Sequence, residues 1–141
     1  MLIKEMDVIV CSNDQNPANF IVELEETLDL SKLYQVAIKS ISIATPSNVG
    51  NGKQLGFIYS NMVPHTNVNL KQRRYMALFP FDSNKGYNHQ EFINPTYRTI
   101  CKEATLEMEF EILNLQNERL QFSSGSITNF PTVIALHFRE I

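Results

Sequence analysis

Strict alternation of apolar and polar residues is the feature that most limits what this chain can fold into. The segment TLEMEFEIL (residues 105–113) places apolar side chains on one face of an extended strand and three glutamates on the other. The inward residues predicted there are Leu106, Met108, Phe110 and Ile112. The segment TVIALHF (132–138) repeats the pattern, with Ile134, Leu136 and Phe138 predicted inward. A period of two predicts β-strands that each bury one face.

One segment changes the parity of its alternation partway along. In YQVAIKSISI (34–43), two apolar residues of one parity are followed by two of the other. All four can face the core only if one extra residue is inserted between the pairs, so we expect a β-bulge near Lys39 or Ser40. The four residues are Val36 and Ile38, then Ile41 and Ile43.

Turn-forming segments separate about eight such runs, and no repeat or heptad divides the chain. About eight antiparallel strands in two sheets predict an all-β sandwich that forms one domain over residues 1–141. Eight strands suit a jelly roll, although spacing alone does not separate it from an immunoglobulin-like topology. Segments 64–74 and 82–97 exceed ordinary hairpin lengths and are expected to be loops available for contacts.

Charge and cysteine usage argue against several functions. The 141-residue chain has a net charge of −3, and its densest basic run, Lys71–Arg74, is short, so we expect no direct nucleic-acid binding. Charged residues interrupt the apolar N-terminal run, so neither a signal peptide nor a membrane span is expected. Cys11 and Cys101 lack a metal-ligand spacing and are expected to be reduced thiols, with one long-range disulfide left open.

Glu107, Glu109 and Glu111 raise the question of whether the chain is an enzyme. Same-face residues two apart in a strand lie roughly 6.5–7 Å apart, close to the carboxylate separation of inverting glycosidases. A catalytic acid needs burial, however, and the apolar face of this strand already supplies its buried side. We expect these glutamates to face water or a partner. The prediction is therefore no enzyme, with no catalytic, metal-binding or cofactor-binding residue and no cofactor.

Aromatic and histidine side chains supply the candidate contact surface. The segment GYNHQEFINPTY (86–97), expected to be a loop that includes His89, is rich in amphipathic groups of the kind used at interfaces. His137 lies between two apolar residues and is expected on the polar face of its strand. A second interpretation, in which Phe92 and Tyr97 cap the end of the core, stays open. The candidate subunit-contact residues are Tyr87, His89, Phe92, Tyr97 and His137.

The order of several segments resembles one protein family. SNDQNPANFIVELEETLDLSKLYQVAIKSIS (12–42) is similar to the family's opening, with its Asn-rich lead, Phe-x-Val-x-Leu strand and Leu-Asp-Leu turn. FIYSNMVPHTNVNLKQRRYMALFPF (57–81) is similar to the family's middle. YNHQEFINPTYRTI (87–100), LEMEFEILNLQNERLQFSSG (106–125) and PTVIALHFRE (131–140) are similar to its end. The family is the minor capsid, or penton, proteins of Polinton (Maverick) elements and their adintovirus and virophage-like relatives.

The resemblance covers about residues 12–140 and implies a single jelly roll without catalytic residues. It further implies homopentamers at the five-fold vertices of an icosahedral capsid, with a double jelly-roll major capsid protein as partner. The chain would then be a virion protein, assembled inside the host cell in the cytoplasm or nucleus. Segment 45–54 and the turn at Asn117 and Glu118 depart from the family pattern, which bears on lineage more than on fold.

Two other functions stay open at this point. A sandwich-type binding module for carbohydrate or protein would present exposed tyrosines, such as Tyr75, Tyr87 and Tyr97, spaced to stack on sugars. A small jelly-roll enzyme would hold a metal ion, or a carboxylate with a strongly raised pKa among the three glutamates.

Overall fold

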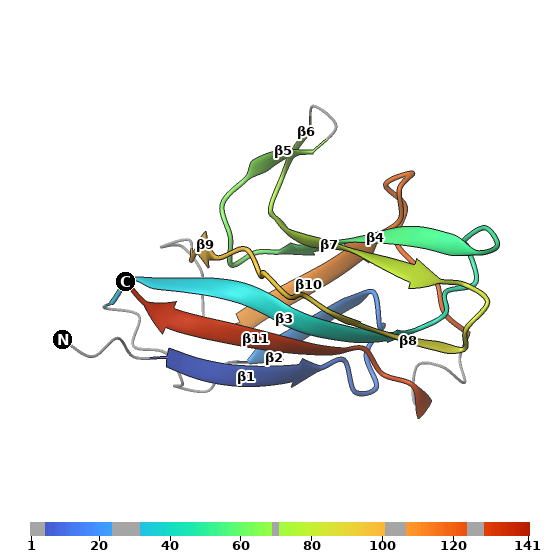
Figure 1. Cartoon of the computed structure of the whole chain (residues 1–141), viewed down its shortest axis with the longest axis horizontal. Coiled ribbons are helices and arrows are strands. Elements are labelled where there is room, and N and C mark those ends of the chain that lie inside the picture. The colour runs from blue at the N-terminus through green and yellow to red at the C-terminus, as the bar shows by residue number, and fades with distance from the viewer. Residues whose placement is uncertain (1–4, 24–31, 69–70, 101–106, 124–128) are drawn as a thin grey trace.

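The computed structural model describes residues 5–23, 32–68, 71–100, 107–123 and 129–141 (Figure 1). Every element bounded within these residues is a strand, and eight of them form the body of the molecule. These are β1 (Glu5–Cys11), β2 (Asn19–Glu23), β3 (Tyr34–Ala44), β4 (Lys53–Ser60), β7 (Tyr75–Asp82), β8 (Tyr87–Glu91), β10 (Glu107–Leu113) and β11 (Val133–Glu140). Three shorter strands are β5 (Thr66–Val68), β6 (Lys71–Arg73) and β9 (Arg98–Thr99).

The eight longer strands form two layers. One sheet has the order β1-β11-β3-β8, with β9 also paired to β3, and the other has the order β2-β10-β4-β7. All pairings are antiparallel. The short strands β5 and β6 pair with each other and stand clear of the two layers (Figure 1).

The pairing pattern identifies the topology as a jelly roll. In chain order, the first of the eight longer strands pairs with the last, the second with the seventh, the third with the sixth and the fourth with the fifth. Alternate pairs belong to alternate sheets, as happens when one long antiparallel ribbon is rolled up. The expected all-β jelly-roll sandwich with about eight antiparallel strands in two sheets is confirmed.

The core consists of the predicted inward faces. Met108, Phe110 and Ile112 on β10 are fully buried, and so are the three predicted inward residues of β11. Phe110 stacks on Phe20 of the neighbouring strand, with ring centroids 5.4 Å apart. Leu106 lies outside the described residues. The alternation therefore gave the correct register for both strands.

The expected bulge lies in β3. Ser40 pairs with Ala135 and Ile38 with Leu136, so Lys39 is the extra residue. The apolar residues on both sides of the bulge are buried, as the change of parity requires. The Lys39 carbonyl accepts a hydrogen bond from the Phe92 backbone N–H at 2.9 Å, which ties the segment after β8 to the bulge.

Two segments predicted as loops contain strands, which corrects the sequence reading. Segment 64–74 includes the β5–β6 hairpin, and segment 82–97 includes β8, where His89 lies. The sequence YNHQE of β8 gives no apolar alternation because its buried side chain is Asn88, only 9% exposed. The Asn88 amide accepts from the Asp82 N–H at 3.0 Å and donates to the Asp82 carbonyl at 3.1 Å. An amide satisfied by backbone replaces the expected apolar residue.

The register of β10 can be tested with two substitutions in adjacent positions. Phe110→Ala should lower the free energy of unfolding by about 3–5 kcal/mol because it empties a closely packed core site. Glu109→Gln should change it by less than about 0.5 kcal/mol because that side chain is exposed. Chemical denaturation of both variants checks this, and a larger cost for Glu109→Gln would contradict the register.

Gly56 provides a second test of core packing. It lies opposite Phe79 in the β4–β7 pair, and a Cβ atom at this position would come within 2.5 Å of the Phe79 ring. Gly56→Ala should therefore destabilise the protein by about 1–3 kcal/mol through overpacking. Gly86→Ala is the matched control, because a Cβ there meets nothing within 4 Å. Equal melting temperatures for the two variants would argue against this packing.

Candidate assembly surface

Four of the five predicted contact residues gather on the outer face of the β1-β11-β3-β8 sheet. His137 on β11 lies opposite Asp7 on β1 and Ala37 on β3. His89 lies on the β8 edge strand, opposite Ser42. Tyr87 is on the same strand two residues earlier, and Tyr97 contacts His137 from the segment between β8 and β9.

His137, Tyr97 and Arg139 form a compact polar cluster on this face. Tyr97 Oη lies 2.8 Å from His137 Nδ1, and the two rings meet edge to face with centroids 5.8 Å apart. The Arg139 guanidinium lies 3.5 Å from the centroid of the Tyr97 ring and donates from Nε to Gln35 Oε1 at 2.9 Å. Cation–π stacking and hydrogen bonding together fix the Tyr97 ring on the sheet.

Tyr87 and His89 line the β8 edge of the sheet. Tyr87 is 39% exposed, and its hydroxyl donates to the Pro131 carbonyl at 3.0 Å. Partial burial raises the pKa of this hydroxyl; nearby Cys11 adds to the rise and a hydrogen bond with Ser42 opposes it. The Tyr87 hydroxyl therefore remains a donor at neutral pH. His89 Nδ1 lies 2.6 Å from Ser42 Oγ.

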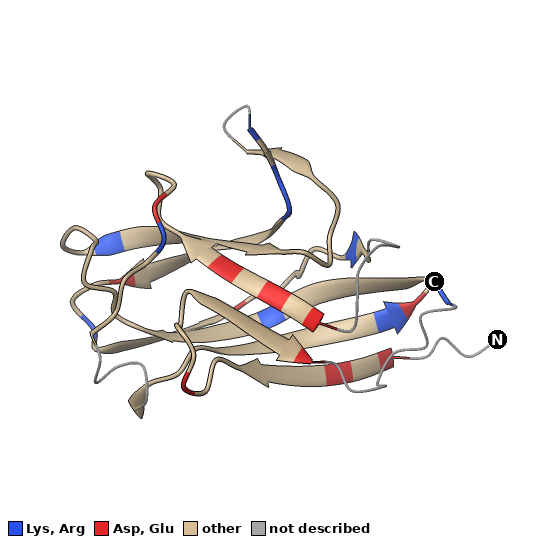
Figure 2. Cartoon of the chain, turned by 180° about the vertical axis from the view of Figure 1, so that it is seen from behind, with Lys and Arg blue, Asp and Glu red and all other residues tan. Residues whose placement is uncertain are grey.

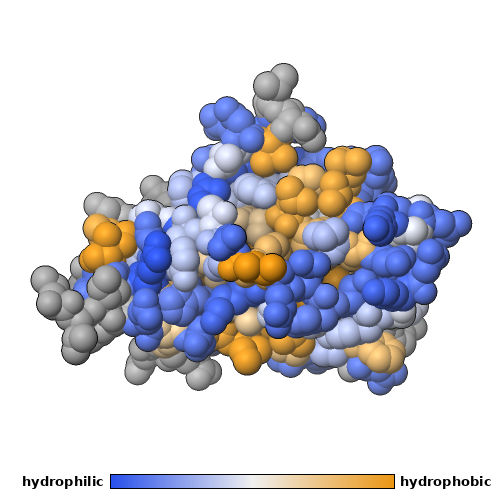
Figure 3. Space-filling view, in the orientation of Figure 1, coloured by the Kyte–Doolittle hydropathy of each residue, from blue (hydrophilic) through white to orange (hydrophobic). Residues whose placement is uncertain are grey.

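Phe92 is placed differently from the other four. It is partly buried and packs against the core, as the core-capping interpretation describes. Its neighbour Ile93 is 93% exposed, and Ile9 on β1 is 72% exposed. Both isoleucines line a shallow depression of about 380 Å³ with Lys39 and Glu91 at its rim. Figure 3 shows apolar side chains standing among polar ones on the face turned to the viewer.

The exposed isoleucines are the surface residues that sequence reasoning missed. The alternation in EMDVIVC could have revealed Ile9, because its parity is opposite to that of Val10, which is buried. No comparable signal marks Ile93, which lies outside any strand.

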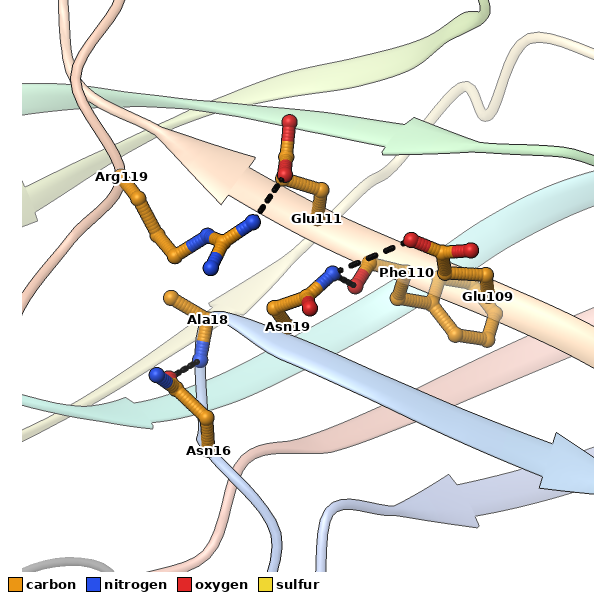
Figure 4. Close-up of polar contacts among 7 residues, drawn as sticks. All are labelled: Asn16, Ala18, Asn19, Glu109, Phe110, Glu111 and Arg119. Atoms are coloured by element: carbon orange, nitrogen blue, oxygen red, sulfur yellow. Dashed lines mark hydrogen bonds and ion pairs between the residues drawn. The ribbon is translucent and has the colours of Figure 1, made fainter.

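The glutamate row occupies the outer face of the other sheet (Figure 4). Glu111 forms an ion pair with Arg119, with Oε2 and Nη2 2.7 Å apart. Glu109 Oε1 accepts a 3.3 Å hydrogen bond from the Asn19 amide, and Glu107 lies opposite Glu23. Glu107 and Glu109 are exposed and Glu111 is partly buried. The row therefore forms a solvent-facing surface of β10, in which Glu109 contacts a neutral amide on β2 and Glu111 contacts a cation in the segment after β10.

The described residues also bear on the chemistry of the chain. They contain no group of three or more His, Cys, Asp or Glu side chains placed to hold a metal ion. Cys11 is a free thiol, whereas Cys101 lies outside the described residues. Among the described elements, none is a helix with the length and hydropathy needed to cross a membrane.

Comparison with known proteins finds a solved structure with the same architecture. The mavirus penton protein superimposes with a TM-score of 0.63, and the match covers 99% of this chain and 100% of that one at 9% sequence identity. This chain shares its fold with the mavirus penton protein. The resemblance drawn from the sequence segments is thus confirmed for the fold over the whole length of both chains.

The other comparisons add no relative. The VP2 subviral particle of infectious bursal disease virus gives a TM-score of 0.22 over 42% of that chain, which is too low to indicate a common fold. No family model matches the sequence, and no curated protein matches it.

The polar cluster on the outer face can be tested by removing one hydroxyl. Tyr97→Phe should lower the free energy of unfolding by about 0.5–1.5 kcal/mol because it breaks the bond to His137 while keeping the ring under Arg139. Tyr59→Phe is the control, since its hydroxyl has no hydrogen-bond partner among the described residues. Thermal unfolding of the two variants checks this, and equal shifts would contradict a stabilising bond at Tyr97.

Proposed function

We propose that the chain is a penton subunit, a structural capsid protein that assembles as a homopentamer at the five-fold vertices of an icosahedral capsid. Its partner in the shell is a double jelly-roll major capsid protein, and the mature location is the virion after assembly in the host cytoplasm or nucleus. Residues 1–141 act as one jelly-roll domain in this proposal. The chain has no catalytic role and needs no cofactor.

The observation that carries the proposal is the end-to-end match with the mavirus penton protein. The match covers 99% of this chain and 100% of the mavirus protein, so it extends over all the strands of the jelly roll. Fold alone does not specify function. The independent order of sequence segments that resembles penton proteins supports the same assignment.

The surface of the molecule suits a ring subunit. A head-to-tail ring needs two different contact surfaces on each copy. The exposed isoleucines Ile9 and Ile93, together with Tyr87 and His89, give the β1-β11-β3-β8 face an apolar and aromatic character that suits a subunit contact. In this proposal Tyr87, His89, Tyr97 and His137 lie at or near such a contact, and Phe92 supports it from below.

A carbohydrate-binding role is supported less well by the tyrosine positions. Tyr75 lies on the β2-β10-β4-β7 sheet, away from the other two tyrosines. It packs there edge to face against Tyr59, with ring centroids 6.2 Å apart. Tyr87 lies against Phe130, with centroids 6.0 Å apart, and one face of Tyr97 is covered by Arg139. The three rings therefore do not form one open row for sugar stacking.

The proposal is tested by the mass and symmetry of the purified chain. Mass photometry should give a particle of five 16.2-kDa chains, and electron microscopy should show five-fold rings. Co-expression with the major capsid protein of the same element should place the chain in the assembled particles. A chain that stays monomeric and is absent from purified particles would contradict the proposal.

A further inference from the structure

The β5–β6 hairpin, called the arm from here on, stands out from the sandwich beyond β4 and β7 (Figure 1). Arg98 fixes the base of the arm through three of its contacts. Its Nη1 donates to the Tyr75 carbonyl at 3.0 Å, and its Nη2 lies 2.5 Å from Thr66 Oγ1 and 3.4 Å from the Pro64 carbonyl oxygen. The arm is therefore held in a defined direction.

One face of the arm is cationic and overhangs a floor that combines apolar side chains with the amides of Asn114, Gln116 and Asn117. Lys71 pairs with Val68 and Arg73 with Thr66, so both cations share one face of the hairpin. With Phe57, Tyr59 and Leu115, this face lines a cleft of about 160 Å³. The Arg73 guanidinium lies 5.9 Å from the centroid of the Tyr59 ring.

Within the described part of the chain, the two cations of the arm have no acidic partner. No carboxylate among the described residues lies within ion-pair distance of Lys71 or Arg73. Arg74, next in the chain, is engaged differently: its Nη1 donates to the Val63 carbonyl at 3.0 Å, and it shares a shallow depression with Glu109 and Glu111. Arg74 therefore serves its own subunit, and Lys71 and Arg73 are the cations available for another.

The outer face of β2 and β10 has the complementary character. Glu23 lies directly opposite Glu107 across this strand pair, and like charges in that position repel each other. Glu109 lies opposite Ile21, which is 46% exposed, and its described side-chain bond is to the neutral amide of Asn19. An exposed apolar residue framed by carboxylates matches a cleft that has apolar side chains in its floor and cations at its rim. These residues, Ile21, Glu23, Glu107 and Glu109, are called the acidic edge from here on.

The arm and the acidic edge are separate surfaces of the β2-β10-β4-β7 sheet, although Arg74 at the base of the arm shares a depression with Glu109. The arm connects β4 to β7, and β7 is one edge strand of its sheet, whereas β2 is the edge strand at the other side. Figure 2 shows the red bands of β10, β2 and β1 on one part of the body and the blue of the arm standing apart from them. A ring of identical subunits needs this kind of asymmetry, since each copy must present two unlike surfaces.

We propose that the arm of one subunit docks on the acidic edge of the next, with Lys71 and Arg73 pairing with Glu23 and Glu109 around Ile21. This inference rests on the proposed homopentamer and assigns one of its contacts. With a net charge of −3, two copies repel each other at long range, and a local basic surface that faces an acidic one offsets this repulsion. A second copy is the occupant because the chain itself supplies the matching surface.

The test is a charge swap in the full chain, measured by mass photometry in low and moderate salt. Lys71→Glu/Arg73→Glu should shift the particle from five chains to one, and Glu23→Lys/Glu109→Lys should do the same. All four substitutions in one chain should restore the ring, because the reversed arm then meets a reversed edge. Raising the salt concentration should weaken the wild-type ring, since the pairs are partly exposed.

Controls separate this inference from the proposed function and from misfolding. Lys53→Glu/Lys85→Glu makes the same charge change on exposed residues away from the arm, and it should leave the ring intact. Unchanged circular dichroism and thermal unfolding of each variant should show that its subunit is folded. If both double variants still form pentamers, or if the variant with all four substitutions stays monomeric, the arm contact is wrong but the proposed pentamer is not affected. A monomeric wild-type chain overturns both.

Discussion

The burial of one face of every long strand between the two sheets is the constraint on which the rest of the structure depends. The largest fully buried side chains include Phe20, Phe79, Phe110 and Phe138, and each contributes about 1.5–3 kcal/mol by leaving water. A slip of one residue in β10 would turn Phe110 outward and turn the three glutamates of the strand toward the core, where an unpaired charge is very costly. The hydrophobic layer therefore fixes the register of the strands, and the register decides what appears on both outer faces.

The bulge in β3 shows how a demand of the core shapes the surface. Without the extra residue, either Val36 and Ile38 or Ile41 and Ile43 would face water. Inserting Lys39 keeps all four buried and directs a cationic side chain outward, where Nζ lies 3.6 Å from Asp7 Oδ1. The same residue's carbonyl holds the segment that carries Ile93. Surface chemistry at the depression thus follows from packing beneath it.

How much could be predicted from the sequence depended on which strands bury apolar side chains. The registers of β3, β10 and β11 followed from alternation because their inward residues are apolar. The strand β8 escaped detection because it buries Asn88, whose amide is satisfied by the backbone of Asp82. The arm escaped for a related reason: its strands bury nothing between the sheets, and Arg98, remote in sequence, supports it. The contact candidates Tyr87, His89, Tyr97 and His137 came together on one face only because β8 joined the sheet beside β3.

The match to the mavirus penton protein at 9% identity indicates which properties such a chain can keep while its sequence changes. An alternating pattern accepts any apolar residue of suitable size at an inward position, so the jelly roll persists through extensive substitution. Contacts between subunits have no such tolerance, because a charge must meet its opposite and an exposed side chain must meet a matching hollow. Each lineage therefore has to change both sides of a contact together. For this reason the contacts of the proposed penton subunit have to be found from its own surface residues, and a cationic arm and an acidic edge are the two unlike surfaces that the proposed ring would require.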